Sequence, residues 1–218
     1  MGRTNCAYAS PVRTAVSAIA SASDLLASRH VAGRVYATFD GHYNDDYRPY
    51  VYVSGDYGQS WRPLAAGLPE TSVNRVREHP KDPRLLILAH ERGVHFSNDG
   101  GLSWNSLATN MPTVPVDDAV IQERDNALVV GTHGRGIWIL DDVGPLSGLA
   151  SEALAASALL MPVPRARLWS TWSPQAWYGH GEFFAPNPDF DAVISYYVRD
   201  GAVGQAQVEI GDANGSAV

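Results

Sequence analysis

The sequence predicts an all-β fold in which about three four-stranded blades of a larger β-propeller are followed by the start of a β-sandwich. The main observation is a nine-residue pattern that occurs twice, once at Val53–Trp61 and again, 43 residues later, at Phe96–Trp104. A period of about 40–45 residues is typical of four-stranded propeller blades. The 20 glycines and 14 prolines fit an all-β chain with many turns.

Both copies of the pattern fit Ser-x-Asp-x-Gly-x-Ser-Trp and predict a hairpin turn. Aspartate or serine at the start of a turn can hydrogen-bond the backbone two residues on, and glycine supplies the positive φ that closes it. The tryptophan after the turn is expected to fold back between sheets, with its indole N–H bonded to a carbonyl. The expected structural residues are Ser54, Asp56, Gly58 and Trp61 in the first copy, Ser97, Asp99, Gly101 and Trp104 in the second, and Asp142 and Gly144 in a third that lacks the tryptophan.

The repeat extends beyond the turns and divides the chain. A shift of 43 residues also places His90 on His133 and Arg92 on Arg135. The predicted blades span about residues 22–66, 72–109 and 115–170, after an unassigned segment 1–21 and before an aromatic and proline-containing linker 171–191 and the first strands of a truncated sandwich at 192–218.

Alternating apolar residues predict the individual strands. They are Ser23–Ala27, Gly33–Phe39, Tyr50–Ser54 and Ser60–Leu64 in the first blade, Val73–Arg77, Leu85–Ala89, Val94–Ser97 and Ser103–Leu107 in the second, and Asp117–Ile121, Ala127–Thr132, Gly136–Leu140 and a late Ala166–Ser170 in the third. Between the last two, Leu149–Leu160 is expected to form a short helix. Ala192–Arg199 and Gln205–Gly211 are expected to pair as a hairpin.

Three blades do not close a propeller ring, which normally needs four or more. Either the chain is a piece of a longer protein or several copies assemble, and we favour the first. The expected partners therefore include the remaining blades.

Composition excludes several classes of function. A formal net charge of −7 argues against nucleic acid or an anionic membrane as partner. The single Cys6 excludes an intrachain disulfide and a multi-cysteine metal site, and no apolar run is long enough to span a membrane. No cofactor or metal is expected. The N-terminus loosely resembles a signal peptide ending at Ala20-Ser21-Ala22, but Ser10-Pro11 and Arg13 interrupt it, so a surface segment or the remnant of a preceding blade is preferred.

The turn motifs resemble Asp-boxes, also called BNR repeats. Tyr36–His42, Asn44–Tyr47 and Gly131–Asp142 look like the last blades of a large bacterial family with sortilin-type propellers, whose members are commonly labelled glycosyl hydrolases. The resemblance covers about residues 22–212 and implies an exported multi-bladed propeller, extracellular or periplasmic, followed by an immunoglobulin-like sandwich. Xyloglucanase-type glycosidases, photosystem II assembly factors and sialidases are similar in using Asp-boxes. A shared Asp-box implies shared architecture and leaves the chemistry open.

The inserted loop of the first blade carries the first group of candidate ligand-binding residues. They are Asp40, His42, Asp45, Asp46 and Tyr47, with Tyr43 and Asn44 between them. Carboxylates beside aromatic rings suit a sugar, and oxygen ligands also suit calcium. The competing interpretation is that Asp and Asn only make and solvate the turn.

A second group is the pair His133 and Arg135, in a turn where an arginine fork beside glycines suits an anion. Because a similar turn occurs in the preceding blade, a repeated structural contact is the favoured interpretation. Trp169, Trp172, Trp177 and Tyr178 are interpreted as packing between modules in preference to a sugar platform. The acidic pairs Asp117-Asp118 and Asp141-Asp142 are interpreted as solvated turns.

The sequence thus predicts a scaffold that binds a glycan or a protein, with no catalysis expected from this piece alone. The alternative is part of a secreted glycoside hydrolase, xyloglucanase-like or sialidase-like. Such enzymes use two carboxylates that flank the scissile bond, and the sequence identifies no such pair. The catalytic residues are therefore unknown.

Overall fold

The computed structural model describes residues 20–107, 110–149, 154–166, 191–201, 204, 207–212 and 214–216. The chain divides into two compact units, unit 1 (Met1–Ala150) and unit 2 (Ser151–Val218). The described helical elements are short, namely the 3₁₀ turn η1 (His42–Asn44) and the helix α2 (Gly144–Gly148). The remaining elements are strands in four antiparallel sheets, which confirms the all-β class and is consistent with propeller blades.

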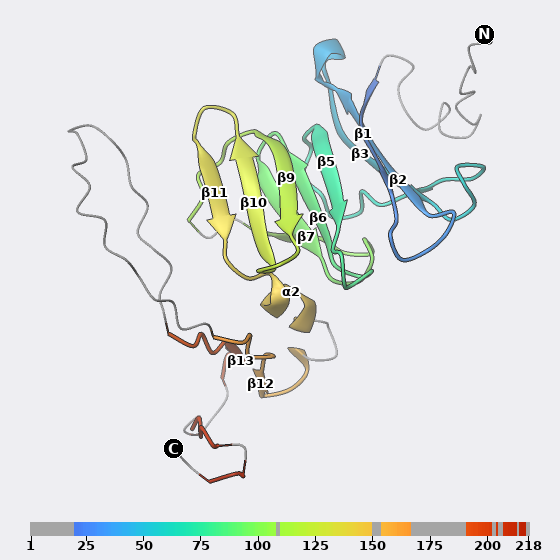
Figure 1. Cartoon of the computed structure of the whole chain (residues 1–218). Helices are drawn as coiled ribbons and strands as arrows, with labels where there is room; N and C mark the ends of the chain where they lie inside the picture. The colour runs from blue at the N-terminus through green and yellow to red at the C-terminus, as the bar shows by residue number, and fades with distance from the viewer. Residues whose placement is uncertain are drawn as a thin grey trace, which may run out of the picture. The chain divides into compact units, whose positions relative to one another are not determined.

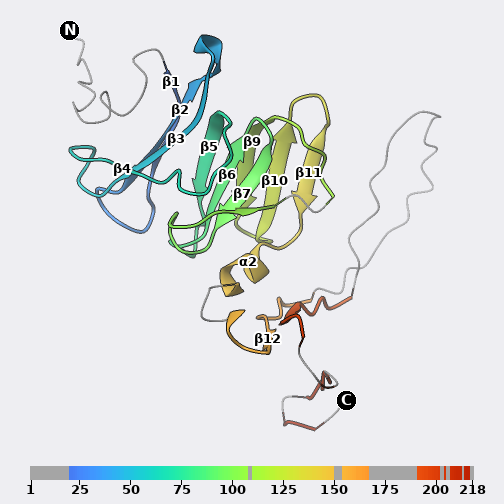
Figure 2. The same ribbon diagram turned by 180° about the vertical axis from the view of Figure 1, so that it is seen from behind.

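Unit 1 contains three sheets whose strands follow one another in chain order (Figures 1 and 2). Sheet A is β1 (Ser21–Ala27), β2 (Val35–Gly41), β3 (Asp46–Ser54) and β4 (Arg62–Pro63); sheet B is β5 (Val73–Glu78), β6 (Leu86–His90), β7 (Gly93–Ser97) and β8 (Asn105–Ser106); sheet C is β9 (Val116–Gln122), β10 (Ala127–Thr132) and β11 (Ile137–Leu140).

The inner strands lie where the alternation predicts them, but the outer strands β4 and β8 are only two residues long. Five-residue strands were expected at both places. In β4 the second residue is Pro63, which has no N–H to donate to a ladder, and the chain then bends so that Leu64 N–H donates to Val51 O (2.8 Å).

The three sheets pack face to face and enclose two hydrophobic layers. Between sheets A and B lie Tyr36, Val53 and Leu64 of the first and Leu88 and Trp104 of the second, all buried. Between sheets B and C, the core includes the following buried side chains: Ile87, Val94, Phe96, Val116, Leu128, Val130 and Leu146. Sheet B is therefore apolar on both faces, as a central layer must be.

Unit 2 contains β12 (Ala158–Leu160) and β13 (Tyr196–Val198), which pair antiparallel. The helix expected over Leu149–Leu160 is wrong at its described end, since Ala158–Leu160 forms a strand. The expected hairpin is also wrong, because β13 pairs with β12 and residues 207–210 form no strand. Pairing between distant segments overrides local pattern here.

Several other expectations fall outside the described residues. They concern the segment 1–19, most of the linker 171–191, and the late strand Ala166–Ser170 apart from its first residue. The sandwich and the domain bounds remain predictions. No helix among the described residues is long and apolar enough to cross a membrane.

Candidate functional site

The connections β2–β3, β6–β7 and β10–β11 lie at one end of the three sheets, because each sheet repeats the same strand order and direction (Figure 1). We call this the loop end and the opposite end the turn end. The candidate residues of the inserted loop (40–47) and of the turn 132–136 all lie at the loop end. The repeated turns at 54–61 and 97–104 lie at the turn end.

Asp40 fixes the start of the inserted loop. Its carboxylate accepts hydrogen bonds from the backbone N–H of His42 (2.9 Å) and from the His42 ring at Nδ1 (2.5 Å). Burial alone would raise the pKa of Asp40, but these hydrogen bonds outweigh it, and the pKa is lowered overall. The carboxylate is therefore ionised at neutral pH and holds the His42 ring in place.

Asp46 fixes the end of the same loop. It accepts two hydrogen bonds from the Arg48 guanidinium, at Nε (2.9 Å) and Nη2 (2.7 Å), and a third from Tyr50 Oη (2.7 Å). The Arg48 bonds hold the pKa of Asp46 well below its usual range. Asp40 thus has its partner in the loop, and Asp46 has its partners in β3.

The ring of Tyr43 points outward from this fixed loop. It is 86% exposed and lies 4.0 Å, centroid to centroid, from the His42 ring that Asp40 holds. Tyr47 is 52% exposed. The loop turns at Asp45, which has φ 60° and donates its N–H to His42 O (3.1 Å). An exposed aromatic ring therefore sits on a pre-ordered support.

His133 and Arg135 lie in the β10–β11 turn and are exposed. The His133 ring is 3.3 Å from a carboxylate oxygen of Asp117. Its counterpart His90 in sheet B is 1% exposed and bonds the His95 ring (2.7 Å). The shared sequence position thus has two different environments.

The two repeated turns at the turn end have the same hydrogen-bond network. In the first, Ser54 Oγ donates to Asp56 (2.8 Å) and accepts from Gly58 N–H (2.8 Å), while Asp56 accepts from Ser60 N–H (2.8 Å) and Ser60 Oγ (2.5 Å). The corresponding bonds of the second turn, among Ser97, Asp99, Gly101 and Ser103, are 2.6–3.0 Å long. The Ser60 bonds lead those that lower the pKa of Asp56 to about 2.

The tryptophans that follow these turns differ in burial. Trp104 is buried and its indole N–H donates to Leu64 O of sheet A (2.7 Å). Trp61 is half-buried and donates to Gly58 O of its own turn (3.0 Å). In the third, degenerate turn, Asp142 accepts from Gly144 N–H (2.8 Å) and from the side chain of Asn126 (2.7 Å).

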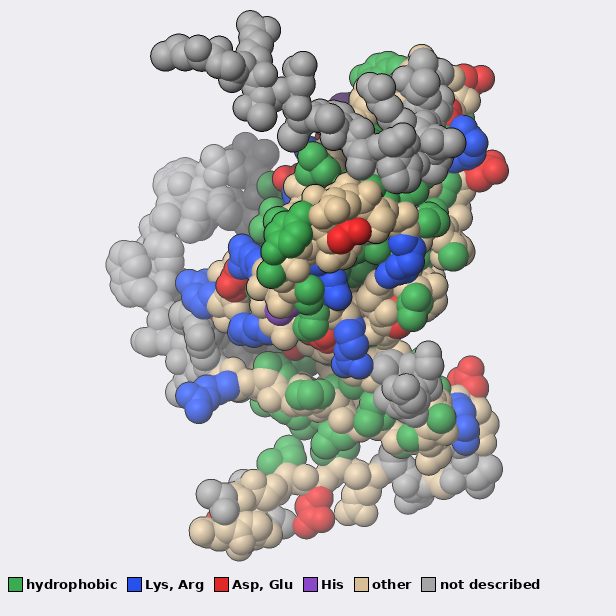
Figure 3. All heavy atoms as spheres, turned by 90° about the vertical axis from the view of Figure 1, so that its right-hand side faces the viewer, with side chains coloured by type: hydrophobic (Ala, Val, Ile, Leu, Met, Phe, Trp, Pro, Cys, Tyr) green, Lys and Arg blue, Asp and Glu red, His purple; other side chains and the backbone are tan. Residues whose placement is uncertain are grey.

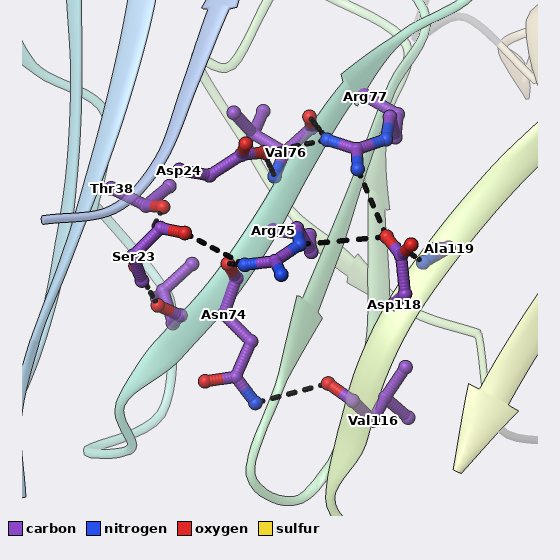
Figure 4. Close-up of polar contacts among 11 residues, drawn as sticks. Ser23, Asp24, Thr38, Asn74, Arg75, Val76, Arg77, Val116, Asp118 and Ala119 are labelled. Carbon is purple, nitrogen blue, oxygen red and sulfur yellow. Dashed lines mark hydrogen bonds and ion pairs between the residues drawn. The ribbon is translucent and has the colours of Figure 1, made fainter.

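A polar ladder crosses the first strands of the three sheets, β1, β5 and β9 (Figure 4). Arg77 of β5 donates to Asp24 of β1 (2.6 Å) and to Asp118 of β9 (2.9 Å). Arg75, two residues earlier, donates to Ser23 O (2.7 Å), and its Nε lies 3.5 Å from Asp118. Four charged side chains therefore join three sheets.

Sequence reasoning missed this ladder. Asp118 was assigned to a solvated turn, but it lies within β9 and bridges two arginines. A signal was present in the predicted strand Val73–Arg77, where Arg75 and Arg77 alternate and so share one face. The neighbouring strands were predicted too, but not which of their side chains lie beside these arginines.

The described residues contain no group of three or more His, Cys, Asp or Glu side chains arranged to hold a metal ion. In the inserted loop, the carboxylates that would serve calcium, Asp40 and Asp46, bond His42, Arg48 and Tyr50.

Comparison with known proteins gives partial structural similarities. The sequence matches no protein-family model and no curated protein. Solved structures similar to part of this chain include the GH74 xyloglucanase from Xanthomonas campestris (13% identity, TM-score 0.44), an ancestral GH74 enzyme (20%, 0.43) and the GH74 enzyme of Niastella koreensis (16%, 0.44). The matches cover 54%, 64% and 54% of this chain but only 20%, 16% and 19% of those chains. With TM-scores below 0.5, the similarity is limited to the arrangement of part of the chain.

Proposed function

We propose that the chain is a glycan-binding part of a larger propeller and that the sugar lies against the Tyr43 ring at the loop end. The observation that supports this most is the outward, 86% exposed Tyr43 ring on a loop that is already fixed by Asp40 and Asp46. A rigid aromatic side chain offers contact area at low entropic cost, so binding does not have to order it first.

The role we assign to the candidate carboxylates follows from their partners. Asp40 and Asp46 position the loop, while Tyr43, Tyr47 and the outward part of the Arg48 guanidinium contact the sugar. Arg48 is exposed and offers N–H donors to hydroxyl groups. His133 and Arg135, at the same end of the sheets, supply donors for a longer ligand.

The wider setting is part of the same proposal. The repeated turns with their Ser-Asp-Ser networks are Asp-boxes of the BNR type, and the chain is a section of an exported, sortilin-type propeller followed by an immunoglobulin-like domain. A protein ligand is the competing partner for the same loops. Robust capture of a protein, with no glycan bound, would favour that reading.

The test is a glycan array followed by calorimetry on the glycan that binds, with xyloglucan oligosaccharides included because of the sequence resemblance. Tyr43→Ala should weaken binding at least about tenfold, as expected when a stacked ring is lost. The matched control is Tyr57→Ala, because Tyr57 is 76% exposed on the same sheet but at the turn end. Equal affinities of Tyr43→Ala and the unmodified chain would contradict the proposal.

The alternative is glycoside hydrolysis by the larger protein. A general acid in such an enzyme needs a raised pKa. Every described carboxyl group with a resolved shift, Asp40, Asp46, Asp56, Asp99 and Asp212, has a lowered pKa, so none of these five fits the role of general acid. Release of reducing ends from xyloglucan by this chain would overturn the binding proposal in favour of the enzyme.

A further inference from the structure

A pocket of about 260 Å³ lies at the turn end of sheet A, opposite the loop end. Its lining residues are Arg34, Val53, Ser54, Gly55, Ser60, Trp61 and Arg62. They come from three places in the chain: the residue before β2, the end of β3 with its turn, and the start of β4. Figure 3 shows Lys and Arg side chains interspersed with hydrophobic and acidic ones in the middle of its view of unit 1.

The donors of this pocket are cationic. Its lining contains two arginines and no Asp or Glu. Arg34 forms an ion pair with Glu78 (3.8 Å), and its side chain remains 33% exposed. Among the described residues, Arg62 forms no ion pair. The hydroxyls of Ser54 and Ser60 both donate to Asp56, so the two arginines are the lining side chains left to donate to a ligand.

The wall of the pocket is an indole whose position is fixed. Trp61 donates its N–H to Gly58 O (3.0 Å), and this bond holds the ring beside the turn. A planar apolar wall next to two arginine forks suits a ring that carries a carboxylate. The fork binds carboxylate with two parallel hydrogen bonds, and the ring covers the indole.

The corresponding place in sheet B is different, which makes the pocket specific to sheet A. There Trp104 is buried against Leu64 of the preceding sheet, so the space is filled. At the positions of Arg34 and Arg62, sheet B has Arg84, which pairs with its own Asp82 (3.6 Å), and the uncharged Asn105. The repeat thus keeps the tryptophan in both sheets but places two arginines beside it only in sheet A.

We propose that this pocket binds a carboxylate-bearing sugar, a uronic acid residue of an acidic glycan, with Arg34 and Arg62 on the carboxylate and Trp61 against the sugar ring. The site lies at the opposite end of the sheet from Tyr43, so it does not rest on the function proposed above. It gives an acidic chain one local cationic site for an acidic saccharide.

The test is calorimetry of the full chain with trigalacturonate, and with maltotriose as a neutral trisaccharide. Trigalacturonate should bind and maltotriose should not. Arg62→Gln should weaken binding at least about tenfold, because charge-assisted hydrogen bonds are lost. Arg62→Lys, which keeps the charge but loses the fork, should give an intermediate loss.

The matched control is Arg84→Gln, which removes an exposed arginine at the equivalent place in sheet B and should leave binding unchanged. Tyr43→Ala should also leave it unchanged, which separates this site from the loop end. Absence of trigalacturonate binding would overturn the proposal. So would equal losses in Arg62→Gln and Arg84→Gln, since these would indicate attraction by overall charge alone.

Discussion

At the scale of single residues, the two tryptophans of the repeated turns show how identical motifs can contribute differently. The indole N–H of Trp104 satisfies a carbonyl of another sheet, whereas that of Trp61 satisfies its own turn. Only the first bond links two sheets. Loss of the Trp104 bond leaves the carbonyl of Leu64, a residue that is 1% exposed, without this donor.

We therefore expect Trp104→Phe to lower the free energy of unfolding by about 1–3 kcal/mol, through a lost buried hydrogen bond and a smaller ring. Trp61→Phe should cost less than about 1 kcal/mol, because the ring is only half-buried against its own sheet and its hydrogen bond lies within its own turn. Urea unfolding of both variants measures the difference. A larger cost for Trp61→Phe would contradict the assignment of Trp104 as the inter-sheet contact.

The pair His90 and His95 in sheet B predicts that the free energy of unfolding depends on pH. His90 Nδ1 accepts the N–H of Arg92 (3.1 Å), so its neutral ring carries the proton on Nε2 and donates it to His95 Nδ1 (2.7 Å). Burial, followed by the charges of His95 and Arg92, lowers the pKa of His90 to about 4; burial also lowers that of His95. Both rings are thus held neutral in the folded chain.

Because the folded-state pKa lies below the unfolded value of about 6.5, the contribution to stability is complete above pH 6.5 and is lost as the pH falls toward 4. The free energy of unfolding should be about 2 kcal/mol lower at pH 5 than at pH 7. His90→Gln should flatten this slope, while His133→Gln, at an exposed site, should not. A slope unchanged in His90→Gln would show that other groups cause it.

At the scale of elements, the second turn docks against sheet A through a glycine. A Cβ built on Gly101 would lie 2.9 Å from Leu64 Cδ1, whereas one on Gly100 would meet nothing within 4 Å. Both glycines have positive φ, 87° and 76°. The two positions therefore carry similar backbone strain and differ in their contact with the neighbouring sheet.

Gly100→Ala should lower the free energy of unfolding by about 1 kcal/mol, the cost of a left-handed alanine. Gly101→Ala should cost that amount plus about 1–3 kcal/mol for overpacking against Leu64. Thermal or urea unfolding of the two variants gives the cost of overpacking against Leu64 as the difference between their free energies of unfolding. Equal losses would indicate that the turn does not press on sheet A.

The polar ladder should be uneven in strength. Asp24 is the more buried partner of Arg77 and also accepts the N–H of Val76 (3.2 Å), whereas the Asp118 side chain is 53% exposed. Asp24→Asn should cost about 1–3 kcal/mol and Asp118→Asn about 1 kcal/mol or less, because solvent screens the exposed pair. A urea unfolding series with both variants tests this order, and the reverse order would contradict it.

These elements also show what sequence can and cannot predict. The turns and inner strands are local: Ser54, Asp56 and Ser60 bond one another within seven residues, so the motif alone specifies them. The pairing of β12 with β13 joins residues nearly 40 positions apart, so no local sequence pattern predicts it. For the same reason the sequence placed Arg77 in a strand without its partners Asp24 and Asp118.

At the scale of the whole molecule, each copy of the sequence repeat corresponds to one antiparallel sheet of unit 1. Sheets A, B and C each bury a face against a neighbour, and the loops at one end are left to vary. The inserted loop of sheet A, with Tyr43 and Tyr47, is the longest departure from the repeat. In the candidate site, the loop residues were predicted from the insertion and the side chains it carries, but the division into supporting carboxylates and an outward ring required the structure.

The most direct test of this account is an NMR titration of the full chain with the neutral saccharide selected on the glycan array. The readout is the change in backbone amide chemical shifts. We predict that the changes concentrate at residues 41–48 and 132–136, at the loop end, and that the saccharide is recovered intact. Shifts confined to the turn end around Trp61 and Trp104, or cleavage of the saccharide, would contradict it.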